Sequence, residues 1–228
     1  MSAVPRLADA TWSEVAVGGA AHLVVPLGSC EQHGPHLPLD VDTRIAEAVA
    51  RRLVGRRDDL TLGPTISVGA SGEHSGFPGT LSIGSEVLEL VVIELARSAD
   101  HFASVVVVNG HGGNVDALVR AARVLESDGR RFCHLNCHVP GSDPHAGWGE
   151  TSILLHLAPE VVRMERAEIG VMKPWSEIGG RVVAEGFAAV SPNGVLGDPT
   201  RAAAADGERL LAELVDRLSL EMAGWTDD

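Results

Sequence analysis

Residues 21–42, AHLVVPLGSCEQHGPHLPLDVD, join an apolar run to a cluster of acidic and imidazole side chains. The apolar part, residues 21–27, predicts a buried strand. If the extended course continues beyond this run, Glu31 and His33 point to the same side, because side chains alternate along a strand. Asp42 stands just before a helical pattern and can return to supply a carboxylate that two cations share. The segment therefore predicts a metal site at the end of a buried strand.

A second apolar run ends in a glycine loop, since residues 105–114 are VVVVNGHGGN. In open parallel sheets, ligands bind where loops leave the carboxyl ends of the strands, so we expect His111 on the same edge as the first cluster. The flanking glycines let the backbone bend and approach a ligand closely. The helix expected next would offer its N-terminal amides to a developing oxyanion. Taken alone, a histidine beside a glycine loop is more often structural.

A third cluster, DPHAGWGETS at residues 143–152, again follows a strand-like run. Glu150 falls in the first turn of a predicted helix, where the helix dipole favours a carboxylate, and His145 lies just upstream. Acid and imidazole groups at three strand ends predict a mixed nitrogen and oxygen ligand set for paired Zn, Fe or Mn ions in a hydrolase. The predicted metal ligands are Glu31, His33, Asp42, His111 and Glu150.

Strand-like and helix-like segments alternate along the chain, which predicts an α/β fold with a parallel central sheet. Apolar runs predict strands at 21–27, 60–68, 104–109 and 131–138. Amphipathic spacing predicts helices at 42–54, 84–100, 114–127, 149–157 and 200–223. No composition shift or long linker divides the sequence, so we expect one domain over residues 1–228. The segment 165–190 is expected to form either an irregular excursion or a lid over a pocket.

Composition limits the partners and the compartment of the protein. The formal net charge of -13 on 228 residues disfavours nucleic acid and anionic membranes as partners, because both repel an acidic surface. The three cysteines form neither a disulfide framework nor a zinc-ribbon pattern, which favours a reducing cytoplasm. The sequence shows no signal peptide and no transmembrane run. Small molecules or peptides are the expected ligands.

Several residues keep more than one interpretation. Cys30 could be a nucleophile with His33 or His36 as its base, but no electropositive setting or orienting group is evident. The segment 71–80, SGEHSGFPGT, is either a tight connection or a pocket wall that carries an acid and a histidine. Large aromatic residues that are either pocket walls or packing residues are Phe77, Trp148 and Trp175. Histidines expected to be structural or at the surface are His22, His101, His134 and His156.

The three motifs resemble those of the creatininase family of metal-dependent amidohydrolases, and the resemblance covers most of the chain. The shared motifs are GS-x-E-x-HG-x-HLP, NGHGGN and PHAG-x-x-ETS. The resemblance implies a three-layer α/β/α fold and a homo-oligomer, usually a hexamer. It also implies that His145 is the catalytic histidine that carries protons. Four residues match the family's two-metal centre, in which the aspartate bridges the ions: Glu31, His33, Asp42 and His111.

One position departs from the creatininase pattern. Creatininase carries a glutamate ligand two residues after the loop histidine, whereas this chain has Gly113. We therefore expect Glu150 to supply the missing ligand. The alternative that Glu150 carries protons stays open. Four segments together resemble one branch of the family in particular: residues 69–74, 81–84, 141–147 and 194–200. Its members are peptidases that cleave the modified ribosomal precursor peptide of the redox cofactor mycofactocin and release a Val-Tyr-derived dipeptide. Two alternatives stay open, namely hydrolysis of a small cyclic amide or formamide, and metal binding without catalysis.

Overall fold

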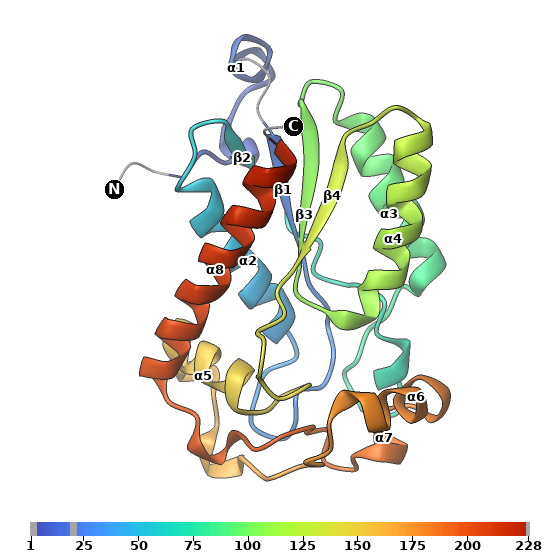
Figure 1. The fold of residues 1–228 in the computed structure, drawn as a ribbon, viewed down its shortest axis with the longest axis vertical. Helices are drawn as coiled ribbons and strands as arrows, with labels where there is room; N and C mark the ends of the chain where they lie inside the picture. The colour runs from blue at the N-terminus through green and yellow to red at the C-terminus, as the bar shows by residue number, and fades with distance from the viewer. Residues whose placement is uncertain (1–3, 19–21, 227–228) are drawn as a thin grey trace.

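The computed structural model of the protein describes residues 4–18 and 22–226. Its centre is a four-stranded parallel sheet with the strand order β2-β1-β3-β4 (Figure 1). The strands are β1 (His22–Leu27), β2 (Leu60–Leu62), β3 (Ser104–Asn109) and β4 (Phe132–Asn136). The predicted parallel sheet is therefore confirmed.

The two central strands are buried on both faces. All residues of β1 and β3 are buried. In β3, Val106 and Val108 join the apolar core on one face of the sheet, whereas Val105 and Val107 join the core on the other. Burial on both faces explains why these strands are continuous apolar runs in the sequence and do not alternate with polar residues.

Helices cover both faces of the sheet, so the predicted three-layer α/β/α fold is confirmed (Figure 1). One face carries α2 (Val41–Val54), α5 (Trp148–Leu157) and α8 (Ala204–Thr226). The other face carries α3 (Ser85–Ser98) and α4 (Val115–Ser127). Each layer of helices shares an apolar cluster with its own face of the sheet, which fixes the three layers together.

The strand order places a topological switch point between β1 and β3. From β1 the chain crosses through α2 to β2, and it then returns through α3, on the opposite face, to β3. The connections that leave β1 and β3 thus diverge to opposite faces and open a crevice at the carboxyl edge of the sheet, where ligands bind in such folds. The three motifs of the sequence follow β1, β3 and β4, so all of them lie at this edge.

Shorter elements complete the chain. The helix α1 (Trp12–Val17) precedes β1, while α6 (Trp175–Glu185) and α7 (Phe187–Val190) lie beyond the carboxyl edge of the sheet (Figure 1). Single turns of 3-10 helix occur at Leu7–Asp9, Gly72–His74, Gly112–Asn114, Pro159–Val161, Met164–Arg166 and Pro199–Arg201. No helix in the described part of the chain is long and apolar enough to cross a membrane.

Two predicted strands are shorter than expected, and one predicted boundary cannot be placed. The strand predicted at 60–68 ends at Leu62, because Pro64 follows closely and has no amide hydrogen for the ladder. The strand predicted at 131–138 ends at Asn136. Ala21, the first residue of the first predicted strand, lies outside the described residues.

The prediction that the segment 165–190 is irregular is wrong in part. This segment contains α6 and α7, whose residues Ile178, Val182 and Phe187 form a third apolar cluster. The last helix also begins later than predicted, at Ala204. A separate 3-10 turn, Pro199–Arg201, precedes it, and the side chain of Asp198 accepts a hydrogen bond from the amide of Thr200 there.

Candidate metal centre

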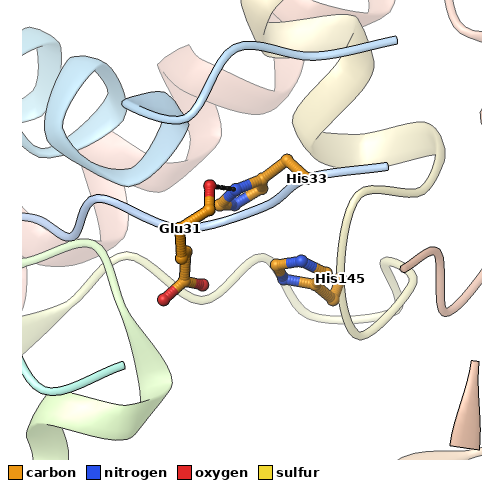
Figure 2. Close-up of side chains that lie close together, drawn as sticks. All are labelled: Glu31, His33 and His145. Atoms are coloured by element: carbon orange, nitrogen blue, oxygen red, sulfur yellow. Dashed lines mark hydrogen bonds between the residues drawn. The ribbon is translucent and has the colours of Figure 1, made fainter. Parts of the chain in front are cut away.

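The loop after β1 brings two potential ligands into the crevice. The amide of Glu31 donates to the carbonyl oxygen of Leu39 at 2.9 Å, which closes the loop. Glu31 and His33 are fully buried, and Nδ1 of His33 donates to the backbone oxygen of Glu31 at 3.2 Å. This bond leaves Nε2 of His33 to face other groups in the crevice. Figure 2 shows the Glu31 carboxylate and the ring of His145 on the same side of this loop.

Asp42 stands between two imidazoles at the start of α2. Its Oδ1 lies 3.3 Å from Nε2 of His33, and its Oδ2 lies 3.3 Å from Nδ1 of His111. The hydroxyl of Ser29 donates to Oδ2 at 2.6 Å and fixes the carboxylate in place. Because each oxygen of Asp42 faces a different histidine, the arrangement is suited to a carboxylate that bridges two ions.

The glycine loop after β3 carries His111 to Asp42. A Cβ at Gly110 would lie 2.3 Å from the backbone oxygen of Asp42, so only glycine permits this approach of the loop to α2. The side chain of Asn109 donates to the carbonyl oxygen of His111 at 2.8 Å. Asn114 ties the loop to its neighbours, since its Nδ2 donates to the oxygen of Gly28 at 3.0 Å. His111 is therefore held by a tight network at the end of β3.

The third motif contributes Glu150 from the first turn of α5 and His145 from the loop before it. Oε2 of Glu150 accepts a hydrogen bond from the amide of Ala146 at 2.6 Å and lies 3.9 Å from Nε2 of His33. Nε2 of His145 donates to the backbone oxygen of Gln32 at 2.9 Å. The ring of His145 lies 4.3 Å from the ring of His33, centroid to centroid (Figure 2).

The structure brings all the predicted site residues together. Three overlapping groups offer ligand atoms that lie within 4.8 Å of one another: Glu31 with Asp42 and His111, His33 with Asp42 and Glu150, and Glu31 with His33 and His145. Asp42 belongs to two of these groups. His145, predicted as a proton carrier, thus also lies where a ligand can lie.

The chemistry of Glu31 tests whether these residues fit a cation. Both carboxylate oxygens are buried and accept no hydrogen bond, although ring nitrogens of His74 and His111 lie 3.3 Å and 3.1 Å away. A buried polar group that makes no hydrogen bond destabilises the folded protein by about 1–3 kcal/mol. For a charged carboxylate the cost is larger. A divalent cation between these carboxylates and imidazoles would remove that cost. The residues therefore fit metal ions better than they fit an apolar core.

Charges in the centre shift the pKa values of the protonated groups upwards. Burial on its own lowers the pKa of His33, but Asp42, Glu150 and Glu31 outweigh it and raise the pKa to about 9. His111 behaves alike: burial opposes the charged form, yet Glu31 and Asp42 hold its pKa well above the usual value. Burial raises the pKa of Glu150 to about 7, although its side chain is 25% exposed. The protons on His33, His111 and Glu150 thus sit on groups that must lose them before a cation can bind.

Other groups shift in the opposite direction. Burial raises the pKa of the Asp42 carboxyl, but His33 and His111 overcome it and hold the pKa well below the usual range. Burial, with added repulsion from His33 and His74, holds the pKa of His145 well below its usual value. His145 is consequently a neutral imidazole near pH 7.

Sequence reasoning left two groups in the segment 71–80 undecided and did not include them in the predicted site. Nε2 of His74 lies 3.3 Å from Oε1 of Glu31, and Oε1 of Glu73 lies 3.2 Å from Nε2 of His111. The available signal was the pair of an acid and a histidine in SGEH, which the glycines around it made equally compatible with a tight turn. The structure supports the pocket-wall interpretation of this segment.

The geometry does not favour Cys30 as a nucleophile. Its Sγ donates to the carbonyl oxygen of Gly79 at 3.7 Å. The imidazole of His33 is engaged with Asp42, and Nε2 of His36 pairs with the hydroxyl of Thr151 at 2.9 Å. Neither histidine is thus placed as a base for the thiol.

A cavity of about 310 Å³ leads to the centre and is lined by residues that include His111 and Glu150. A larger groove of about 790 Å³ adjoins this cavity, because Ser142 and Asp143 line both of them. The groove extends to Trp175. Of the three aromatic residues considered as pocket walls, only Trp175 lines this groove. Trp148 packs against the core beside α8, and Phe77 packs against the cluster of α6 and α7.

Comparison with known proteins defines the class. The model of the family Creatininase, described as creatinine amidohydrolase, matches residues 8–221, and the chain belongs to this family. A crystal structure of creatinine amidohydrolase (creatininase) superposes with a TM-score of 0.79 at 27% identity, covering 98% of each chain. The creatininase resemblance and the fold predicted from the motifs are confirmed.

The relatives narrow the class to one branch. The mycofactocin precursor peptide peptidase of Mycolicibacterium smegmatis is 49% identical over 212 residues, which cover 90% of this chain and 86% of that protein. This is the branch that the motifs predicted. A further solved structure, titled creatininase Mn, has a TM-score of 0.77 at 25% identity and covers 96% of this chain and 97% of its own.

Proposed function

We propose that the protein is a metal-dependent peptidase that hydrolyses the modified mycofactocin precursor peptide and releases its C-terminal Val-Tyr-derived dipeptide. The observation that carries the proposal is the buried carboxylate of Glu31 at the switch point of the sheet, which accepts no hydrogen bond and lies within 3.3 Å of ring nitrogens of His74 and His111. Membership of the creatininase family supports hydrolysis of a C–N bond. The 49% identical peptidase of M. smegmatis supports the peptide as the substrate.

Two divalent cations, Zn, Fe or Mn, fit the ligand set. Glu31, Asp42 and His111 would hold one ion, and His33, Asp42 and Glu150 would hold the other. Such ions lower the pKa of water and polarise a scissile carbonyl. The creatininase structure titled with Mn supports a transition metal in this fold.

The chain's own residues would orient the ions and move protons. Asp42 is oriented by Ser29, and His33 by the backbone oxygen of Glu31, so both keep their positions without the substrate. In the tautomer that donates from Nε2 to the oxygen of Gln32, Nδ1 of the neutral His145 ring carries no proton. His145 can therefore take a proton from water and return it to the leaving amine.

The two cavities beside the metal centre form the expected binding site of the peptide. The smaller cavity reaches His111 and Glu150, and the larger groove continues from it past Met172 and Trp175. A groove of about 790 Å³ falls within the range of ligand sites in proteins, about 300–1,000 Å³. The apolar wall at Trp175 is suited to a side chain derived from valine or tyrosine.

We also propose one domain over the whole chain and self-association of the protein. The family model matches residues 8–221 without interruption, which supports a single domain. Large apolar side chains on α3 are open to solvent, with Val87 50% and Leu90 60% exposed, and Leu81 nearby is 59% exposed. Exposed apolar patches of this kind mark protein interfaces.

The test is mass spectrometry of the metal-loaded protein with a precursor peptide that ends in the modified Val-Tyr. We expect loss of the terminal dipeptide unit, with no cleavage in a chelated control and little in an unmodified peptide. Bound metal without cleavage of the modified peptide would contradict the proposed substrate. A panel of small cyclic amides and formamides, run in parallel, would then identify the alternative activity.

A further inference from the structure

Glu73 reaches the metal centre from a segment that the three motifs do not contain. It lies in the 3-10 turn Gly72–His74, and its Oε1 is 3.2 Å from Nε2 of His111. The same nitrogen lies 3.1 Å from Oε2 of Glu31. Two carboxylates from different loops thus converge on one ring nitrogen.

The number of oxygens around this nitrogen exceeds what a proton requires. The carbonyl oxygen of Ala70 also lies 3.1 Å from Nε2 of His111 and by itself can accept one N–H. The two carboxylates of Glu31 and Glu73 are then in excess. Ligand atoms about 2.1 Å from a zinc ion lie roughly 3–3.4 Å from one another, which is the spacing seen here. The distances from Nε2 of His111 to Glu31 and to Glu73 therefore each match the spacing of two ligands of one ion.

The backbone is shaped to admit the carboxylate. A Cβ at Gly113 would lie 2.4 Å from Oε1 of Glu73 and 2.4 Å from Nε2 of His111. The glycine loop and the turn that carries Glu73 come together only because residue 113 has no side chain. Asn114 joins the same two segments, since the amide of Ala70 donates to its Oδ1 at 2.8 Å. The position of Glu73 is consequently built into the fold.

The charges of the site support a fourth acid. Two divalent cations carry four positive charges, which four carboxylates with neutral histidines would balance. The structure supplies this number with Glu31, Asp42, Glu73 and Glu150. The side chain of Glu73 is 23% exposed, so an ion can reach it from solvent, whereas Glu31 is closed off.

We propose that Glu73 is a further carboxylate ligand of the ion that Glu31 and His111 hold. The proposal rests on the metal centre of the proposed function. The carboxylate of Glu73, from the loop before α3, would take the place of the ligand that creatininase carries at the position of Gly113. Glu150 then belongs to the second ion, with His33.

The test compares metal content and spectrum, with no substrate required. Glu73→Gln, Glu31→Gln and Glu86→Gln are loaded with Zn at defined free concentrations, and the ions per chain are counted by elemental mass spectrometry. Glu86→Gln makes the same change at an exposed position of α3. We expect Glu73→Gln and Glu31→Gln to bind one ion about tenfold or more weakly, and Glu86→Gln to match the unaltered protein.

Cobalt substitution distinguishes a ligand from a neighbour of the ligand. We expect the visible absorption spectrum of the cobalt form to differ between Glu73→Gln and the unaltered protein. In Glu73→Asp, which keeps a carboxylate, we expect the metal to be retained and its absorption bands to shift. Unchanged affinity and spectrum in Glu73→Gln, beside metal loss in Glu31→Gln, would overturn the role of Glu73 alone. Absence of bound metal in the unaltered protein would overturn the metal centre itself.

Discussion

Asp42→Asn removes one charge from the centre and changes little else. Asn keeps the shape of the side chain, and its amide oxygen can still accept the hydroxyl of Ser29. What is lost is the negative charge that faces His33 and His111 at 3.3 Å each. In the metal-free protein this charge is the largest single influence that raises the pKa of His33. The variant should therefore change how stability depends on pH.

The size of the effect follows from the pKa of His33. A ring whose pKa rises from 6.5 in the unfolded chain to about 9 in the folded protein stabilises the fold by about 3 kcal/mol while protonated. This stabilisation is fully present below pH 6.5 and is lost as the pH rises through 9. His145 stays neutral in this window because its pKa is lowered, whereas His111, whose pKa Glu31 and Asp42 also raise, adds to the same pH dependence. We expect Asp42→Asn to lose more than half of this pH dependence.

The assay is urea unfolding of the chelated protein at pH 6.5, 7.5 and 9, at one protein concentration because assembly also changes stability. We expect the variant to be less stable than the unaltered protein by about 3–5 kcal/mol at pH 6.5, with the difference narrowing towards pH 9. Asp116→Asn, an exposed change on α4, is the matched control and should keep the full pH dependence. Equal loss of stability with pH in the unaltered protein and in Asp42→Asn would refute the reasoning.

Three other variants and treatments test separate parts of the site. His145→Ala should lower turnover of the modified peptide by about 100-fold or more while the metal content stays unchanged, since general acid–base groups contribute about 10²–10⁴-fold; loss of metal would show that His145 is a ligand. Gly110→Ala should destabilise the protein and weaken metal binding, because the added Cβ would collide with the backbone of Asp42; an unchanged melting temperature and metal content would contradict the close approach of that loop. Removal of metal by a chelator should lower the unfolding free energy by about 2.7 kcal/mol for each bound ion, relative to protein held at a hundred times the metal dissociation constant, which calorimetry would measure.

Part of the site follows from the chain alone. Apolar runs that end at Leu27 and Asn109 are buried strands of a parallel sheet, and ligands bind at the carboxyl ends of such strands. Glu31, His33 and His111 follow those ends directly, so their convergence could be predicted. The motifs were also specific enough to predict the family and its branch.

Other features depend on contacts between segments that are distant in the sequence. The order β2-β1-β3-β4 is set by the packing of helices on two faces, and periodicity within one strand does not contain it. The helices α6 and α7 were missed because Gly179 and Gly180 weaken the local signal, whereas burial of Ile178 and Phe187 stabilises them.

The sequence by itself determined which strands are buried and which acids and histidines stand at their ends, because burial and side-chain alternation are local properties of the chain. Only the tertiary structure decided that Glu73 and His74 join them. Their segment is a turn rich in glycine. In the folded protein this turn packs against His111 and Glu31, which places Glu73 and His74 at the metal centre. A turn has no periodicity that could predict its partners, so the packing of the loops decides them.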